Sequence, residues 1–151
     1  MPGRFPYNSL PVYPHLGPHD ARLWNRYIAE HPEEYLSCDY DVWVGEGAIP
    51  EAGVGNNVYK GDQRDLTKKR VDVVAYRADG SADCIELRPQ AGSSAIGTII
   101  TNHFLLEAHL AGLPCKPVII TDKAKADIFG IAEKHGIKII ELGFKPGELE
   151  S

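Results

Sequence analysis

The chain has 151 residues, of which 43% are hydrophobic, and a formal net charge of −5. This length and composition predict one soluble globular domain with a single core. No apolar stretch of signal-peptide length begins the chain, and nowhere is there a run of about eighteen apolar residues, so we expect neither export nor a membrane span.

Charge and cysteine content narrow the class further. Because the net charge is negative, any contact with DNA would need a local basic patch. The three cysteines, Cys38, Cys84 and Cys115, form no C-x-x-C pair. We therefore expect free thiols in a reducing compartment.

Residues 1–19 predict an extended, proline-rich arm before a single domain at 20–151. The arm holds five prolines and two glycines, and prolines exclude a helix or a central strand. We expect that the domain core cannot absorb the apolar side chains of the arm and that they contact another chain. These partner-binding candidates are Phe5, Tyr7, Leu10, Val12 and Tyr13.

The next elements are a helix and a strand. Asp20 is a suitable cap for a helix that runs to about Glu30, where Pro32 ends it. The apolar face of this helix is formed by Leu23, Trp24, Tyr27 and Ile28. Alternating residues within 35–45 then predict a strand that is covered on both sides.

A glycine-rich polar segment at 46–69 predicts a long surface loop. It ends in the basic run Lys68, Lys69 and Arg70. These three residues are candidates for contacts with DNA phosphates, although a basic run before a strand is also typical of a solvated sheet edge.

Residues 71–76 and 83–87 predict an antiparallel hairpin. If its loop is Ala78-Asp79-Gly80, with Gly80 in the left-handed conformation, Asp72 faces Glu86 across the two strands. Their Cβ atoms would then be roughly 5 Å apart, and Arg88 would lie on the same face. Two carboxylates so close favour a hard divalent cation such as Mg²⁺ or Mn²⁺.

The same three side chains have a structural interpretation. Arg88 could bridge Asp72 and Glu86 in an ion-pair network on the sheet face, with no metal and no chemistry.

The C-terminal part alternates helices and strands. We expect a helix from Ser93 or Ser94 to about Ala111, a strand at 117–121, a helix at 124–135 and a strand at 137–142. The order α-β-β-β-α-β-α-β predicts an α/β fold with a mixed central sheet flanked by helices.

The run Val71-Asp72-Val73-Val74, the hairpin, and Ile85-Glu86-Leu87-Arg88, followed by a helix and a strand, resemble the PD-(D/E)XK nuclease superfamily. The resemblance implies a restriction-endonuclease-like αβββαβ core, with Asp72 and Glu86 as metal ligands. It also implies an accessory acidic residue from the first helix, for which Glu30 and Glu34 are the candidates.

The chain departs from the family pattern at three positions. The lysine that helps to activate water in the family falls on Arg88, and a guanidinium cannot exchange a proton with water. A glutamine and an aromatic residue on the following helix fall on Thr98 and Asn102. The resemblance therefore leaves two alternatives, a catalytically degraded fold and an active nuclease.

Trp24-Asn25-Arg26-Tyr27-Ile28 and Tyr40-Asp41-Val42-Trp43-Val44-Gly45 resemble short virion proteins of tailed bacteriophages. This resemblance implies a structural adaptor or connector-ring subunit at the head-to-tail junction, with no cofactor. Its partners would be copies of itself, the portal and other neck or tail proteins, in the virion and in the host cytoplasm during assembly. The alternative is a Mg²⁺-dependent nuclease that acts on DNA in processing or packaging.

Overall fold

The computed structural model describes residues 2–45 and 69–149. The elements are β1 (Phe5–Pro6), α1 (Pro18–Glu30), β2 (Ser37–Val44), β3 (Lys69–Tyr76), β4 (Ala82–Ala91), α3 (Ser93–His109), β5 (Cys115–Ala124), the 3-10 helix η2 (Ala126–Ile128), α4 (Phe129–Lys134) and β6 (Lys138–Glu141). The predicted order is confirmed, and β1 adds a short strand in front of it.

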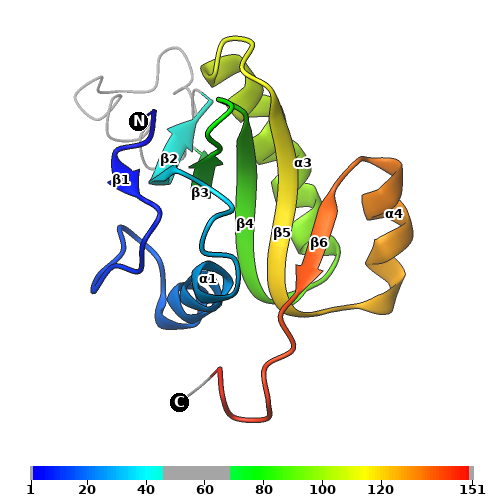
Figure 1. Cartoon of the computed structure of the whole chain (residues 1–151). Helices are drawn as coiled ribbons and strands as arrows, with labels where there is room; N and C mark the ends of the chain where they lie inside the picture. The colour runs from blue at the N-terminus through cyan, green and yellow to red at the C-terminus, as the bar shows by residue number, and fades with distance from the viewer. Residues whose placement is uncertain (1, 46–68, 150–151) are drawn as a thin grey trace, which may run out of the picture.

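The strands form one six-stranded sheet in the order β1-β2-β3-β4-β5-β6. The pairs β1–β2, β2–β3 and β3–β4 are antiparallel, and the pairs β4–β5 and β5–β6 are parallel. Figure 1 shows α1 against one face of this sheet and α3 behind the other. The predicted mixed sheet with flanking helices is therefore confirmed.

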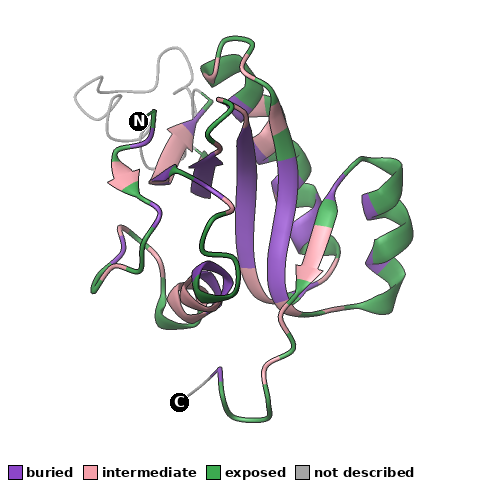
Figure 2. Cartoon of the chain, in the orientation of Figure 1, coloured by how far each residue is buried: buried purple, intermediate pink, exposed green. Residues whose placement is uncertain are grey.

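The sheet separates two apolar cores. The first lies under α1 and includes Trp24 and Ile85. The second lies under α3 and α4 and includes Ile99 and Ile119. Figure 2 shows β4 and β5 as the most continuously buried strands, because helices cover both of their faces.

The β3–β4 hairpin has the predicted register. Val74 is paired with Cys84, and the Arg77 amide donates to the Ser81 carbonyl at 2.8 Å. Gly80 has a φ of +90°, which is the left-handed conformation that closes a three-residue loop. The loop therefore fixes which residues of the two strands face each other.

Strands β2 and β3 change their facing halfway along. Tyr40 packs in the core under α1 and Val42 packs against the core under α3, although residues two apart on a regular strand share a face. Asp41 between them has a φ of +52°. It lies opposite Asp72 of β3, where the same change occurs, so the irregularity places Asp72 at a turning point of the sheet.

Two predicted boundaries need correction. Helix α1 begins at Pro18 after Gly17, so Asp20 lies inside its first turn and is not the cap. Proline suits this start because its missing N–H is not needed there. The helix predicted at 124–135 is shorter, because β5 continues to Ala124 beside β4 and the α-helix begins only at Phe129.

The N-terminal arm packs on the core of its own chain, so the expectation that the core cannot absorb its apolar side chains is wrong, while its contact with another chain stays a prediction. Tyr7 and Tyr13 are buried under the α1 side of the sheet, and Phe5 and Leu10 pack against them. The arm needs neither a helix nor a central strand to do this, because its aromatic rings contact those of Trp24 and Tyr40 edge-on or tilted. Only Val12, which is 81% exposed, remains outside.

Candidate functional site

Asp72 and Glu86 lie where β3 and β4 separate. The last paired residues of the two strands are Val73 and Ile85, and the acidic residues come next on each strand. Here the Leu87 amide donates to Oδ2 of Asp72 at 2.9 Å. The aspartate thus fills a gap that a backbone carbonyl would fill in a continuous ladder.

Glu86 is a buried carboxyl without a full set of partners. The residue is 6% exposed. Its Oε2 atom accepts no hydrogen bond within the described part of the chain. Burial, followed by hydrogen bonding with Asp72 and repulsion from it, raises the pKa of Glu86 to about 9. Such a group is costly to bury unless a proton or a cation accompanies it.

A third carboxyl, that of Asp20, reaches the same region from the first turn of α1. Burial and then the charge of Asp72 raise the pKa of Asp20 to about 6, while Arg88 and His19 act in the opposite direction. The charge of Asp20 is thus coupled to those of Asp72 and Arg88, but within the described residues Asp20 forms no metal-binding cluster with Asp72 and Glu86. Asp20, at the start of the helix, is a candidate for the accessory acidic residue.

Arg88 is held in place by helix α3. Its Nη2 atom donates to Oγ1 of Thr98 at 3.1 Å and lies 3.7 Å from Oε2 of Glu86. Its Nη1 atom donates to Oγ of Ser94 at 3.4 Å. Among the contacts of the described residues, none joins Arg88 to Asp72, so the predicted bridge across both carboxylates is not formed.

Thr98 and Asn102 support the site although they depart from the family pattern. Thr98 accepts the bond from Arg88, and Asn102 donates to the Arg70 carbonyl at 3.1 Å. The buried Asn102 thus joins α3 to β3 two residues before Asp72. Through these two contacts, helix α3 holds Arg88 and the start of β3.

Asp72 and Glu86 fit a magnesium ion better than a transition metal. Both supply hard oxygen ligands. Oε2 of Glu86 has no hydrogen-bond donor among the residues that the structure describes, and a cation could take the place of the missing donor. No cluster of three or more metal-binding side chains has formed within residues 2–45 and 69–149. Mg²⁺ tolerates this, because it commonly takes one or two carboxylates and keeps several waters.

Glu30 and Glu34 lie away from this site. Glu34 accepts a hydrogen bond from Arg77 at 3.1 Å, and Glu30 forms an ion pair with Arg26 on the surface of α1. These contacts do not support the predicted accessory role for either residue, because Glu30 is the last residue of α1 and Glu34 lies in the connection after it, beside Arg77 of the hairpin.

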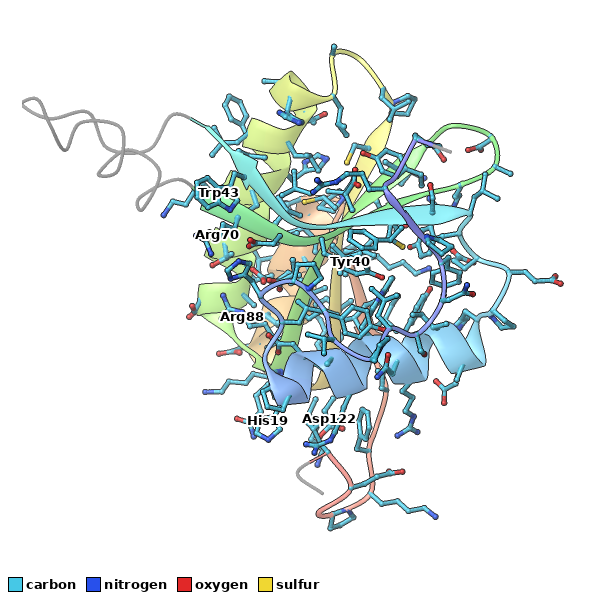
Figure 3. The ribbon with its side chains drawn as sticks, turned by 90° about the vertical axis from the view of Figure 1, so that its left-hand side faces the viewer. His19, Tyr40, Trp43, Arg70, Arg88 and Asp122 are labelled. Carbon is cyan, nitrogen blue, oxygen red and sulfur yellow. The ribbon has the colours of Figure 1, made fainter. Side chains whose placement is uncertain are left out.

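The predicted basic run is split by its surroundings. Lys68 lies outside the described residues. Lys69 is exposed and lines a cavity of about 370 Å³ with Thr98 and Asn102. The Arg70 guanidinium lies over the Trp43 ring, 4.5 Å from its centroid. Figure 3 shows Trp43, Arg70, Arg88 and His19 following one another along one side of the molecule.

The mixed six-stranded sheet, with an Asp, a Glu and a basic residue where β3 and β4 separate, defines a restriction-endonuclease-like nuclease fold. In the described ranges no helix has the length and apolar character that crossing a membrane requires. No family model and no curated protein matches the sequence.

Three solved structures share the fold. A protein of unknown function, AF1548, is 19% identical with a TM-score of 0.55 over 87% of this chain. A repair endonuclease from Pyrococcus abyssi is 17% identical, with a TM-score of 0.52 over 88% of this chain. The EndoMS–dsDNA2 complex is 16% identical, with a TM-score of 0.50 over 88% of this chain.

The chain spans only part of each of these structures, namely 62%, 49% and 48% of their lengths in the same order. At this level of identity the similarity establishes the fold alone. It supports the nuclease resemblance of the sequence, whereas the phage resemblance rests on its sequence motif alone.

Sequence reasoning found Asp72, Glu86 and Arg88 but missed Asp20 and Ser94. A signal for Asp20 existed, because Pro18 is a frequent first residue of a helix and would have moved the helix start upstream. No local signal identifies Ser94 as a partner of Arg88, because that contact depends on how α3 packs on β4.

Proposed function

We propose that the chain is a DNA nuclease that depends on Mg²⁺ or Mn²⁺ and uses Arg88 where related sites use lysine. The observation that carries the proposal is the buried, incompletely partnered Glu86 carboxyl beside Asp72. The names of two structures with this fold, a repair endonuclease and a complex with dsDNA, support the same class of activity.

Asp72 and Glu86 would hold the metal ion. A bound divalent cation would polarise the phosphate and lower the pKa of water. Cation binding would require Glu86 to lose the proton that its raised pKa favours, and metal affinity would therefore rise with pH.

Arg88 stabilises negative charge on the reacting phosphate. A guanidinium keeps its proton at every relevant pH, so it cannot be the base. The contacts with Ser94 and Thr98 hold the side chain from α3. A donor that is held in advance loses little entropy when the phosphate charge develops.

Asp20 is the candidate proton acceptor in this scheme, because Asp72 and Glu86 would hold the metal and Arg88 keeps its proton, while burial and the charge of Asp72 raise the pKa of Asp20 to about 6. The oxygen of water bonds to phosphorus and its proton passes to the Asp20 carboxylate. The bond from phosphorus to the leaving oxygen breaks, and that oxygen takes a proton from solvent.

The test is cleavage of linear duplex and single-stranded DNA with Mg²⁺ or Mn²⁺ by the wild type and by Glu86→Gln. We expect metal-dependent cleavage by the wild type and none by the variant. Glu133→Gln, on the exposed surface of α4, is the matched control and should cleave normally. A wild-type protein that cleaves no DNA with either metal would overturn the proposal.

The competing role is that of a ring subunit in a phage neck. It rested in part on an arm that its own core could not bury, and the arm is largely buried in that core; the long loop that also supported it lies mostly outside the described residues. No described feature therefore favours the ring subunit over the nuclease.

A further inference from the structure

A second cavity, of about 630 Å³, lies beyond Arg88 along β4. It lies at the carboxyl ends of β4 and β5, between the first turn of α1 and the C-terminal segment 142–149. Its walls include His19, Gln90, Lys123 and Lys145. None of these four side chains has a role in the site described above.

Residues that line the cavity follow or precede those of the proposed active site in the sequence. His19 precedes Asp20 on α1, and Gln90 lies two residues beyond Arg88 on β4. Strand β5 runs alongside, with Gln90 paired to Lys123. Figure 3 shows His19 and Asp122, which both line the cavity, on the same side as Arg88 and beyond it. A strand of DNA that passes the carboxylates would therefore meet this cavity next.

The C-terminal wall of the cavity is fixed by hydrogen bonds. The Phe144 amide donates to Oδ1 of Asp122 at 2.6 Å, and the Leu142 amide donates to the Thr121 carbonyl at 2.8 Å. At the far end, Nη1 of Arg22 donates to the Leu149 carbonyl at 2.7 Å. The segment thus has anchors to both β5 and α1, and the cavity is part of the fold.

The lining is cationic although the whole chain is acidic. Lys123 and Lys145 are exposed and face a cavity whose acidic lining residue, Asp122, already accepts the Phe144 amide. The chain as a whole, with a net charge of −5, repels a phosphate, whereas these two lysines attract one locally. A neutral or cationic ligand would gain nothing from these two lysines.

We propose that this cavity binds a phosphate of the DNA backbone next to the one that is cleaved, through Lys123 and Lys145. The inference rests on the proposed function, because it takes its direction from the carboxylates. It assigns to β5 and the C-terminal segment the task of positioning the strand beyond the point of cleavage.

The experiment measures binding of a fluorescein-labelled DNA duplex by anisotropy over a range of salt concentrations. It uses the full chain with Glu86→Gln, so that cleavage cannot interfere. In this background Lys123→Ala/Lys145→Ala should weaken binding about tenfold at low salt and reduce the slope of log K against log salt by about 2, one for each lysine. The matched control is Lys134→Ala/Lys138→Ala, on α4 and β6, and it should change neither quantity.

Unchanged binding and slope in Lys123→Ala/Lys145→Ala, or an equal loss in the control, would overturn the inference. Its failure is distinguishable from failure of the proposed function. A wild-type protein that cleaves DNA while the double variant binds normally removes only the phosphate site. A wild-type protein that does not cleave while the double variant loses binding removes only the nuclease.

Discussion

The two ends of the β3–β4 pair each carry a buried acidic residue, and the two residues differ in how many hydrogen-bond donors surround them. Near the hairpin loop, Asp83 accepts a hydrogen bond from the Tyr35 hydroxyl at 2.6 Å and two from Arg77 at 3.0 and 2.7 Å. Where the strands separate, Glu86 is as deeply buried, yet its Oε2 atom has only the more distant Arg88.

The comparison separates a buried carboxylate that the fold supplies with hydrogen-bond donors from one that it does not. Asp83 has its donors within the fold, and its network joins the connection between α1 and β2, through Glu34, to the hairpin. Glu86 leaves bonding capacity that a cation outside the chain could use. A buried group with missing partners in an otherwise well-paired core calls for an explanation, and metal binding supplies one.

Removing the structural charge should have the largest effect on stability. Asp83→Ala leaves the Arg77 guanidinium and the Tyr35 hydroxyl without their acceptor, and we expect a loss of about 3–5 kcal/mol in the free energy of unfolding. Urea denaturation measures it. A loss below about 1 kcal/mol would show that the hydrogen bonds of Asp83 do not stabilise the fold, and the contrast with Glu86 would fail.

Removing the arginine at the other end should affect activity instead. In Arg88→Ala the phosphate charge loses a preformed donor, and we expect kcat to fall about 100-fold with little change in melting temperature. Single-turnover cleavage measures kcat. Arg88→Lys is the informative companion, because it keeps the charge without the two-pronged contact to Ser94 and Thr98; activity equal to the wild type would show that this contact is dispensable.

The tyrosine of the structural network should have a smaller effect. Tyr35→Phe removes one hydrogen bond to a charged acceptor while Arg77 continues to neutralise it, so we expect a loss of about 2 kcal/mol. Thermal unfolding checks this value. Tyr76→Phe is a suitable control, because its hydroxyl lies 3.4 Å from Asp39 and should contribute less; an equal loss in both variants would contradict the central place given to Tyr35.

The last prediction concerns pH. Because the pKa of Glu86 is raised in the folded state to about 9, its contribution to stability is fully present below the unfolded value and is lost as pH rises through the folded value. Glu86→Gln carries no such proton. In EDTA, the melting temperature of the variant relative to that of the wild type should rise between pH 5 and pH 9. The rise should be roughly 2–4 °C for each kcal/mol by which the free energy of unfolding of the wild type falls.

The control for this pH series is Glu133→Gln, whose difference from the wild type should stay constant. A melting-temperature difference for Glu86→Gln that does not change over the same range would show that Glu86 is not held protonated.

Local chemistry in the sequence was sufficient to determine the hairpin register and the order of the elements. The left-handed Gly80 suits a three-residue loop, and that loop sets the register up to the pair of Val73 and Ile85, next to Asp72 and Glu86. The alternation of strands and helices after β4 likewise depends on short-range periodicity, and it predicted the mixed sheet.

Only the tertiary structure decided which residues complete the site. Ser94 contacts Arg88 because α3 packs on the sheet beside β4, and such contacts between remote segments leave no periodic signal. The burial of Tyr7 and Tyr13 has the same origin. An irregular segment can bury aromatic rings wherever the surrounding core offers matching surfaces, and those surfaces exist only after the helix and the sheet have come together.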